Sequence, residues 1–281
     1  MRLAKIYALI YVFIRRFFNF NLPGLGFFLR RINSSSIINF RGRKMYFNHK
    51  VSSSYGLHII DLPQENETHL FLDYLLSDFE DDFSFVDIGA NIGAFLIDVS
   101  RKHNAHLYGF DPFPECVVAI EKSLKLNGVE NYNLYNNLVG DKEAEVLFDL
   151  SIDPEGASVR KQKKSKNQVL LKQVKLDDIL NIESPSIWLI DVEGYEPNVI
   201  IGAKNLINKV KPLIIFEYNE QISKKHFTIS DIKSLIGSDY KCYRLRNDGR
   251  LDSEVENAWN CVAIPSEHVF SDKLRNIILH S

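Results

Sequence analysis

Between residues 83 and 265, short continuous apolar runs alternate with longer segments of mixed polarity. Continuous apolar runs of roughly four to eight residues are typical of strands that are buried on both faces of a parallel sheet. The runs predict strands at residues 83–88, 106–110, 132–136, 187–192 and 213–218, and the segments between them predict helices at residues 92–103, 114–127 and 197–208. This alternation indicates an α/β fold.

The segments outside this series are less regular. The stretch from residue 137 through residue 148 is expected to be irregular or a hairpin, and a lysine-rich loop follows at residues 161–166. After residue 218 the pattern predicts a helix from residue 230 and then two strands, at residues 241–245 and 259–264, with a turn at Asn247, Asp248 and Gly249 between them.

The first apolar strand ends in a glycine turn that opens a helix, in the run FVDIGANIGAF at residues 85–95. A turn of this kind holds an adenosine-bearing cofactor at a helix N-terminus. Gly89 and Gly93 are spaced G-x-x-x-G, whereas dinucleotide binders have G-x-G-x-x-G to admit a pyrophosphate. S-adenosylmethionine has no pyrophosphate, so the G-x-x-x-G spacing is compatible with it. Asp111, at the end of the next strand, is placed to accept hydrogen bonds from ribose hydroxyls.

Two other interpretations of the turn remain open. Glycine also serves any tight strand-to-helix turn, so a non-catalytic protein of the same fold would show the same pattern. A nicotinamide-dependent oxidoreductase would share the strand, the turn and the acidic residue, but it predicts a third glycine where Ala94 and Phe95 stand.

Three further motifs follow in order: VKLDDIL (residues 174–180), WLIDVEGYEPNVIIGA (188–203) and PLIIFEYNE (212–220). Together with the glycine turn they resemble the FkbM family of S-adenosylmethionine-dependent O-methyltransferases, over residues 83–265. The resemblance implies a Rossmann-like class I methyltransferase fold, with a mostly parallel central sheet and an antiparallel C-terminal strand. It also implies hydroxyl acceptors on sugars or secondary metabolites.

The resemblance also implies a cofactor site. The residues expected around the methionine and ribose parts of S-adenosylmethionine are Asp87, Gly89, Asn91, Gly93 and Asp111, and Asn137 is expected near the adenine ring.

Three acidic residues follow later strands and are the candidate catalytic groups: Asp191, Glu193 and Glu217. A neutral hydroxyl is a poor nucleophile, so a carboxylate must accept its proton, or a divalent cation held by carboxylates must acidify it. His58 and His226 are alternative bases. A carboxylate at this point of the chain can also cap the following helix, which is the structural alternative for Asp191.

The sequence argues against two classes of methyl acceptor, amino groups and nucleic acids. Methylases of amino groups typically carry an N/D-P-P-Y/F loop after this strand, and here residues 191–197 read D-V-E-G-Y-E-P. The acidic residues expected at the entrance of the site also argue against a nucleic-acid acceptor, because nucleic acid binds to basic protein surfaces. The sequence therefore predicts O-methylation of a sugar on a cell-surface glycan or its precursor.

Charge is distributed unevenly along the 281 residues, whose net charge is −2. Residues 1–60 hold ten basic and no acidic residues, so we expect a basic extension before a methyltransferase domain at residues 61–281. The apolar run at residues 6–14 is too short for the roughly 20 residues of a membrane-spanning helix. Basic residues beside aromatic ones suit an anchor on an anionic membrane, with packing on the domain or a second subunit as the alternative.

Three widely spaced cysteines, Cys116, Cys242 and Cys261, lack metal-ligand spacing. An odd number of isolated cysteines predicts reduced thiols and a cytoplasmic protein. With the basic extension, the expected location is the inner face of the cytoplasmic membrane. The oligomeric state is left open by the sequence.

Overall fold

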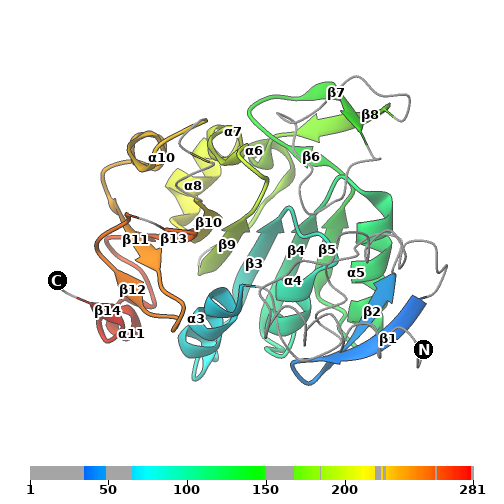
Figure 1. Ribbon diagram of the computed structural model, residues 1–281, viewed down its shortest axis with the longest axis horizontal. Coiled ribbons are helices and arrows are strands. Elements are labelled where there is room, and N and C mark those ends of the chain that lie inside the picture. Colours follow the sequence, from blue (N-terminus) through cyan, green and yellow to red (C-terminus); the bar gives the residue numbers. More distant parts are fainter. Residues whose placement is uncertain are drawn as a thin grey trace, which may run out of the picture.

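The computed structural model describes residues 35–48, 65–149, 168–183, 185–218, 223, 226–256 and 258–279. Its centre is a nine-stranded sheet (Figure 1). In spatial order the strands are β14 (Ile278–Leu279), β12 (Leu251–Asp252), β11 (Tyr240–Leu245), β13 (Asn260–Pro265), β10 (Leu213–Glu217), β9 (Ser186–Ile190), β3 (Phe83–Ile88), β4 (Ala105–Phe110) and β5 (Tyr132–Tyr135). Strands β10, β9, β3, β4 and β5 are parallel neighbours, and β13 runs antiparallel between β10 and β11. The predicted fold class is confirmed.

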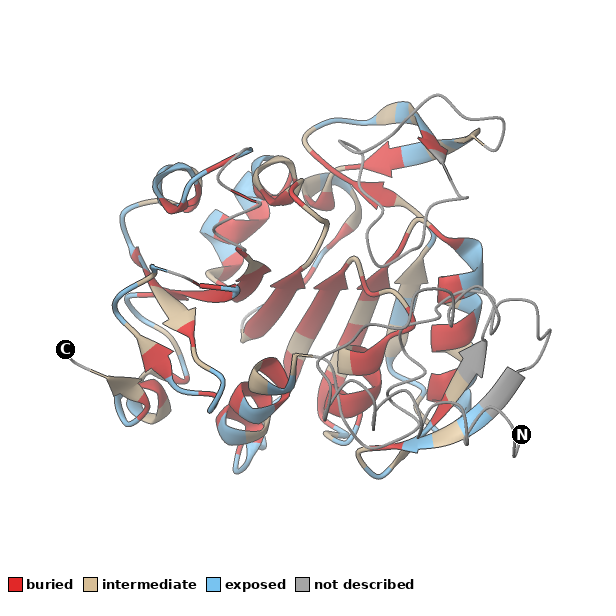
Figure 2. Cartoon of the chain, in the orientation of Figure 1, coloured by how far each residue is buried: buried red, intermediate tan, exposed pale blue. Residues whose placement is uncertain are grey.

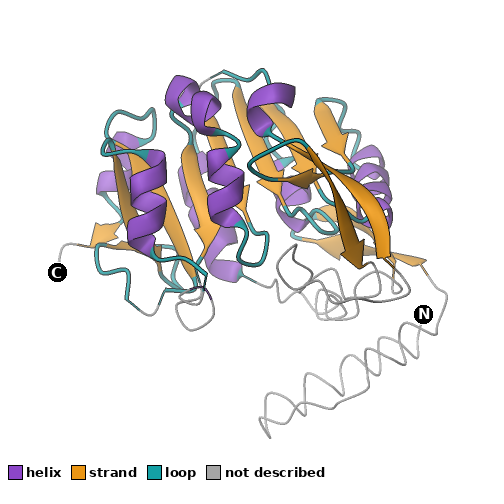
Figure 3. Ribbon diagram, turned by 90° about the horizontal axis from the view of Figure 1, so that it is seen from above, coloured by secondary structure: helices purple, strands orange, loops and turns teal. Residues whose placement is uncertain are grey.

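Helices cover both faces of this sheet (Figures 1 and 3). One face packs against α6 (Leu176–Ile179), α7 (Glu196–Ile201), α8 (Lys204–Val210) and α10 (Ile229–Ile236), and the other against α3 (Asn66–Leu76), α4 (Ala94–Val99), α5 (Pro114–Leu126) and α11 (Ser271–Arg275). Successive side chains of a strand point to opposite faces, so Phe85 and Val86 enter different hydrophobic clusters. Burial on both faces, visible in Figure 2, explains the continuous apolar runs.

Two predicted helices are shorter than expected. The helix predicted at residues 92–103 is only α4, and the one predicted at residues 197–208 is divided into α7 and α8 around Gly202. A Cβ atom at Gly202 would lie 1.9 Å from the carbonyl oxygen of Gly140, so the chain passes too close there for any larger residue. This approach brings β6 (Leu138–Val139) against the α7–α8 junction.

Strand β6 belongs to a second sheet of three strands, in the order β6-β8-β7. The pair β7 (Ala144–Asp149) and β8 (Gln168–Val174) is antiparallel, and β6 pairs with β8, so the partner of both strands lies beyond the lysine-rich loop and not within the stretch that ends at residue 148. The lysine-rich loop lies outside the described residues.

The described part of the basic extension is a hairpin of β1 (Ser35–Phe40) and β2 (Arg43–Asn48), which the sequence pattern did not predict. Arg41 and Gly42 form its two-residue turn, both with positive φ, as the favoured hairpin turns require. Strand β2 packs on α5, where the backbone N–H of Tyr46 donates to Oγ of Ser123 at 2.9 Å. Residues 1–34 lie outside the described residues. Among the helices that are described, none has the length and apolarity needed to cross a membrane.

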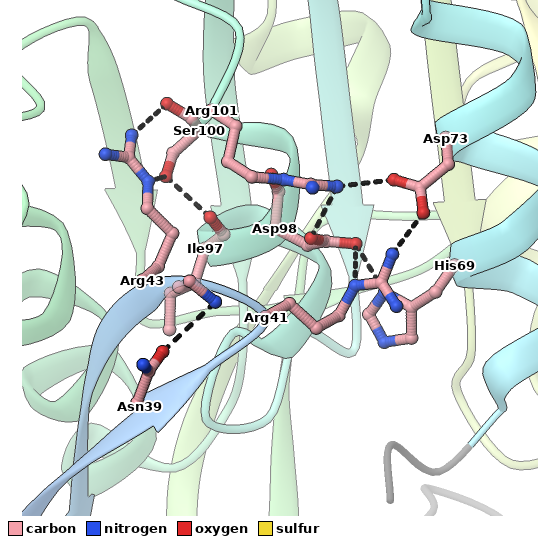
Figure 4. A network of polar contacts seen from close by, with 10 residues as sticks. Asn39, Arg41, Arg43, His69, Asp73, Ile97, Asp98, Ser100 and Arg101 are labelled. Carbon is pink, nitrogen blue, oxygen red and sulfur yellow. Dashed lines mark hydrogen bonds and ion pairs between the residues drawn. The ribbon is translucent and has the colours of Figure 1, made fainter. Parts of the chain in front are cut away.

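An ionic cluster fastens this hairpin to α3 and α4 (Figure 4). We call it the Asp98 network, and it consists of Arg41, His69, Asp73, Asp98 and Arg101. The carboxylate of Asp98, 2% exposed, lies 2.7 Å from Nδ1 of His69, 3.0 Å from Nε of Arg41 and 2.8 Å from a guanidinium nitrogen of Arg101. Burial by itself would raise the pKa of Asp98, but the bond with His69 and the two arginine charges lower it below the ordinary value.

All three cysteines are buried, and none of them forms a disulfide among the described residues. Burial raises the pKa of the Cys242 thiol to about 11 and raises that of Cys261 as well, which disfavours the reactive thiolate form of both.

Candidate active site

A pocket opens at the carboxyl edge of the parallel strands, where the sequence predicts the cofactor. Its walls come from the turns after β3, β4 and β9, with β6 and β7 contributing apolar residues such as Val139 and Phe148. Five acidic residues line it, and we call them the pocket carboxylates: Glu65, Asp87, Asp111, Asp191 and Glu193. None of the described residues that line the pocket is Lys, Arg or His.

The glycine turn after β3 is shaped by close approach of neighbouring chain segments. Gly89 has a φ of +87°, and a Cβ atom there would lie 1.8 Å from the carbonyl oxygen of Asp191. Gly93 has a φ of +80° and is the N-cap of α4, where a Cβ would lie 2.7 Å from Cγ1 of Ile120. Both glycines therefore let β3 and α4 pack against their neighbours. Gly89 lines the pocket and Gly93 does not.

Asp111 closes the turn from the side of β4. Its two carboxylate oxygens accept hydrogen bonds from the backbone N–H groups of Asn91 and Phe113, each at 2.8 Å. Burial raises the pKa of Asp111 to about 7, although the two backbone hydrogen bonds oppose that rise. Each carboxylate oxygen can accept a second hydrogen bond, so Asp111 can bind ribose hydroxyls while it holds the turn.

Asp87 is the most isolated of the pocket carboxylates. Its side chain is 1% exposed, and Oδ2 has no hydrogen-bond partner among the described residues. Burial, and then the charges of Asp111 and Glu65, raise the pKa of Asp87 well above the ordinary value. A buried carboxylate oxygen without a partner in a pocket wall fits a ligand that brings hydrogen-bond donors or positive charge.

The three predicted catalytic residues lie together. One carboxylate oxygen from each of Asp191, Glu193 and Glu217 lies within 4.8 Å of the others, close enough to share one divalent cation. Burial, and then repulsion from Glu65 and the neighbouring glutamates, raises the pKa of Asp191 well above its ordinary value. Chemically, the group can accept a proton or bind a cation.

Glu196, which the sequence did not single out, shapes the loop that carries Asp191 and Glu193. Its side chain is fully buried, and Oε1 accepts the backbone N–H groups of Val192 and Gly194, both at 3.1 Å. These bonds hold Glu193 and Gly194 in left-handed conformations, with φ of 56° and 95°. Helix α7 has no side-chain cap, so the alternative in which Asp191 caps it is not observed.

The pocket gathers most of the predicted site residues. Those that line it are Asp87, Gly89, Asn91, Asp111, Asn137, Asp191 and Glu193, and Glu217 adjoins the last two. His226 packs beside Gly194, where a Cβ would lie 3.4 Å from its Cδ2, and His58 lies outside the described residues. Sequence reasoning missed Glu65 and Phe148 because each comes from a segment without a recognised motif.

The residues that line the pocket suit S-adenosylmethionine as a ligand. The cofactor carries two positive charges, on its sulfonium and its ammonium group, and the pocket offers carboxylates with no described basic residue among them. Phe113 and Phe148, in edge-to-face contact at 5.7 Å, supply apolar surface for the uncharged parts of such a ligand.

Comparisons with known proteins identify the family of the chain. The Methyltransferase FkbM domain matches residues 87–245. "Methyltransferase 1" of Beauveria bassiana is 23% identical over 47% of this chain and 64% of its own length, and the hexuronic acid methyltransferase AglP of Haloferax volcanii is 25% identical over 55% and 63%. The chain thus spans a little under two thirds of either relative. A solved precorrin-6y C5,15-methyltransferase from Geobacter metallireducens aligns with 73% of this chain and 90% of its own, at 16% identity and a TM-score of 0.43. The chain belongs to the FkbM family of methyltransferases, whose cofactor is S-adenosylmethionine.

Proposed function

We propose that this protein transfers a methyl group from S-adenosylmethionine to a hydroxyl oxygen of a sugar, on a cell-surface glycan or its precursor. The observation that carries the proposal is the cluster of Asp191, Glu193 and Glu217 beside the cofactor pocket. A sugar acceptor is supported by one relative, AglP, which is a hexuronic acid methyltransferase. Family membership favours methyl transfer over the nicotinamide-dependent alternative.

We assign separate roles to the side chains of the pocket and of the adjoining acidic cluster. Asp111 and Asn137 bind the nucleoside part of the cofactor, and the walls around Phe113 and Phe148 exclude water from it. S-adenosylmethionine supplies an electrophilic methyl group on a sulfonium. Asp191 accepts the proton of the acceptor hydroxyl at a carboxylate oxygen, and its raised pKa makes it a stronger base than an ordinary aspartate. Glu193 and Glu217 orient the hydroxyl, or hold a divalent cation that acidifies it.

Methyl transfer to isolated glycans, with Asp191→Asn as the variant, tests this proposal. We expect turnover to fall by about 10²–10⁴-fold, the usual contribution of a general base, while S-adenosylhomocysteine affinity changes little. Asp178→Asn is the matched control, because Asp178 is exposed on α6 and does not line the pocket. Loss of activity in EDTA would assign the cluster to a cation.

Three results would contradict the proposal or its assignment of the base. Full turnover by Asp191→Asn would exclude that residue as the base and transfer the role to Glu193 or Glu217. Binding of NAD without binding of S-adenosylhomocysteine would support the oxidoreductase instead, and cofactor binding without methylation of any glycan would support a non-catalytic protein.

The location of the protein belongs to the same proposal and rests on sequence alone. Six basic and no acidic residues among residues 1–32 hold the protein at the inner face of the cytoplasmic membrane. High salt should release only part of it from anionic vesicles, because salt screens charge but does not affect inserted apolar surface. Deletion of residues 1–32 should abolish vesicle flotation and leave methylation of a soluble acceptor unchanged. A truncated protein that unfolds would instead indicate a packing role.

A further inference from the structure

Glu65 enters the cofactor pocket from a part of the chain that the family match, residues 87–245, does not include. It is the N-cap of α3 and has a left-handed backbone, with a φ of 51°. Its carbonyl oxygen accepts the N–H of Thr68 at 3.0 Å, and so starts the helix. Its side chain accepts a hydrogen bond at 3.3 Å from Nδ2 of Asn260, which is 2% exposed. The backbone and the side chain of Glu65 are therefore both held in place.

The helix that carries Glu65 is fixed against the pocket one turn further on. His69 stacks on Phe95 with ring centroids 4.5 Å apart, and Phe95 itself lines the pocket. The same imidazole binds Asp98 in the Asp98 network (Figure 4). Helix α3 thus presents Glu65 to the pocket from a rigid support.

The charge around Glu65 is unbalanced. Burial, and then the charge of Glu67, raises the pKa of Glu65 to about 7. Glu65, Asp87 and Asp191 line the same pocket, and the charge of Glu65 raises the pKa of the other two. Asp87 contributes a buried oxygen without a described partner to the same pocket. Among the described residues, this end of the pocket has an excess of hydrogen-bond acceptors and no cationic side chain.

We propose that Glu65, together with Asp87, binds the α-ammonium group of the methionine part of the cofactor. The ribose hydroxyls are matched by Asp111, and the reacting methyl group must face Asp191 and Glu193. The ammonium is the remaining cationic group. It offers three donors, to Glu65, which already accepts a hydrogen bond from Asn260, and to Asp87, whose Oδ2 has no partner among the described residues. The inference rests on the cofactor of the proposed function and is independent of the acceptor.

Calorimetric titration with two ligands tests this assignment without any turnover. One ligand is S-adenosylhomocysteine, and the other is its analogue in which hydrogen replaces the α-amino group. The wild-type protein should bind S-adenosylhomocysteine about 10–100-fold more tightly than the analogue, the range expected for a hydrogen-bonded charge. In Glu65→Gln this ratio should fall to about threefold or less, because the lost charge acts only on the ligand that has the ammonium.

Glu115→Gln is the matched control. Glu115 is exposed in the first turn of α5, does not line the pocket and is not among the charges that act on Glu65, so this variant should keep the wild-type ratio. Equal weakening of both ligands by Glu65→Gln, or unchanged affinity for S-adenosylhomocysteine, would overturn the assignment. A wild-type ratio near one would overturn it without any variant. If circular dichroism shows that Glu65→Gln does not fold, Glu65→Asp keeps the charge and should give an intermediate ratio. Failure of the wild-type protein to bind S-adenosylhomocysteine would refute the cofactor itself, which is a distinguishable result.

Discussion

The molecule contains two groups of buried and half-buried carboxylates that differ in what surrounds them. In the Asp98 network each carboxylate has cationic partners, and the pKa of Asp98 is lowered despite its burial. Among the pocket carboxylates no described lining residue is basic, and burial raises the pKa of Glu65, Asp87, Asp111 and Asp191. The carboxylates of the network have their cationic partners within the described chain, whereas those of the pocket have none among the described lining residues and suit a cationic ligand.

This difference separates a structural role from a binding role. Burying a charge without a partner is unfavourable. Such a group either binds a proton and becomes neutral, or it pairs with an opposite charge or a hydrogen-bond donor. A cationic ligand that binds the pocket relieves the repulsion and stabilises the fold through its own binding energy. The paired Asp98 gains nothing from such a ligand.

The largest effect of a substitution on stability is expected in the Asp98 network, where each carboxylate has cationic partners. Asp98→Asn should lower the free energy of unfolding at pH 7 by about 3 kcal/mol, because the arginines and His69 lose the charge that compensates them. Urea denaturation measures it. Glu121→Gln is the control, since Glu121 pairs with Lys125 on the exposed face of α5, and such pairs contribute about 0.3–0.5 kcal/mol. An Asp98→Asn protein as stable as the control would refute the structural role of the network.

The pH dependence of stability should have opposite signs for the two groups. Asp111, Glu65 and Glu196 have a pKa of about 7 when folded, above the ordinary carboxyl value, so they stabilise the fold at low pH and that contribution is lost as pH rises through 7. From pH 8 to pH 6 the ligand-free protein should gain about 1.4 kcal/mol for each of them that binds a proton. The lowered pKa of Asp98 means that its contribution disappears only under more acidic conditions, below its ordinary pKa.

Urea denaturation at a series of pH values checks this. Saturating S-adenosylhomocysteine should flatten the rise between pH 8 and pH 6, because the ligand supplies the missing charge. A ligand-free protein that is most stable at pH 8 would contradict the prediction.

A smaller effect, confined to binding, is expected at Asp111. Asp111→Ala should weaken S-adenosylmethionine binding by about 1.5–3 kcal/mol, the value of a hydrogen bond to a charged group. Part of the loss comes through the turn, since the N–H groups of Asn91 and Phe113 also lose their acceptor. Comparison with adenine alone, which has no ribose, isolates the ribose contribution. Unchanged affinity for the full cofactor would exclude Asp111 as the ribose ligand.

Much of this arrangement could be predicted from sequence because it is local. Continuous apolar runs are set by burial on both sheet faces, and the carboxyl ends of parallel strands meet at one edge, which is why Asp87, Asp111 and Asp191 were expected in one site. The two glycines were recognised by their spacing, although their packing roles against Asp191 and Ile120 become visible only in three dimensions.

The unpredicted parts depend on contacts between distant segments. Glu65 reaches the pocket because Asn260 and the Asp98 network position α3, and no pattern near Glu65 records those partners. The β1–β2 hairpin owes its place to α5 and to Arg41, in a segment where the pattern indicated only a basic extension. Helix breaks such as the one at Gly202 follow from a close approach to Gly140, which is equally invisible in the sequence.

The smallest effect should come from removing a charge that has no cationic partner. Glu196→Gln at pH 8 should change the free energy of unfolding by less than about 1 kcal/mol, because the glutamine Oε1 can still accept the N–H groups of Val192 and Gly194. The amide nitrogen replaces Oε2, which has no described partner, so one unsatisfied atom is exchanged for another while a buried charge is lost. Since the pKa of Glu196 is about 7, the variant should compare more favourably with wild type at pH 8 than at pH 6. A loss of the size expected for Asp98→Asn would show that the charge of Glu196 is compensated within the fold, and the distinction between the two carboxylate groups would not extend to this loop.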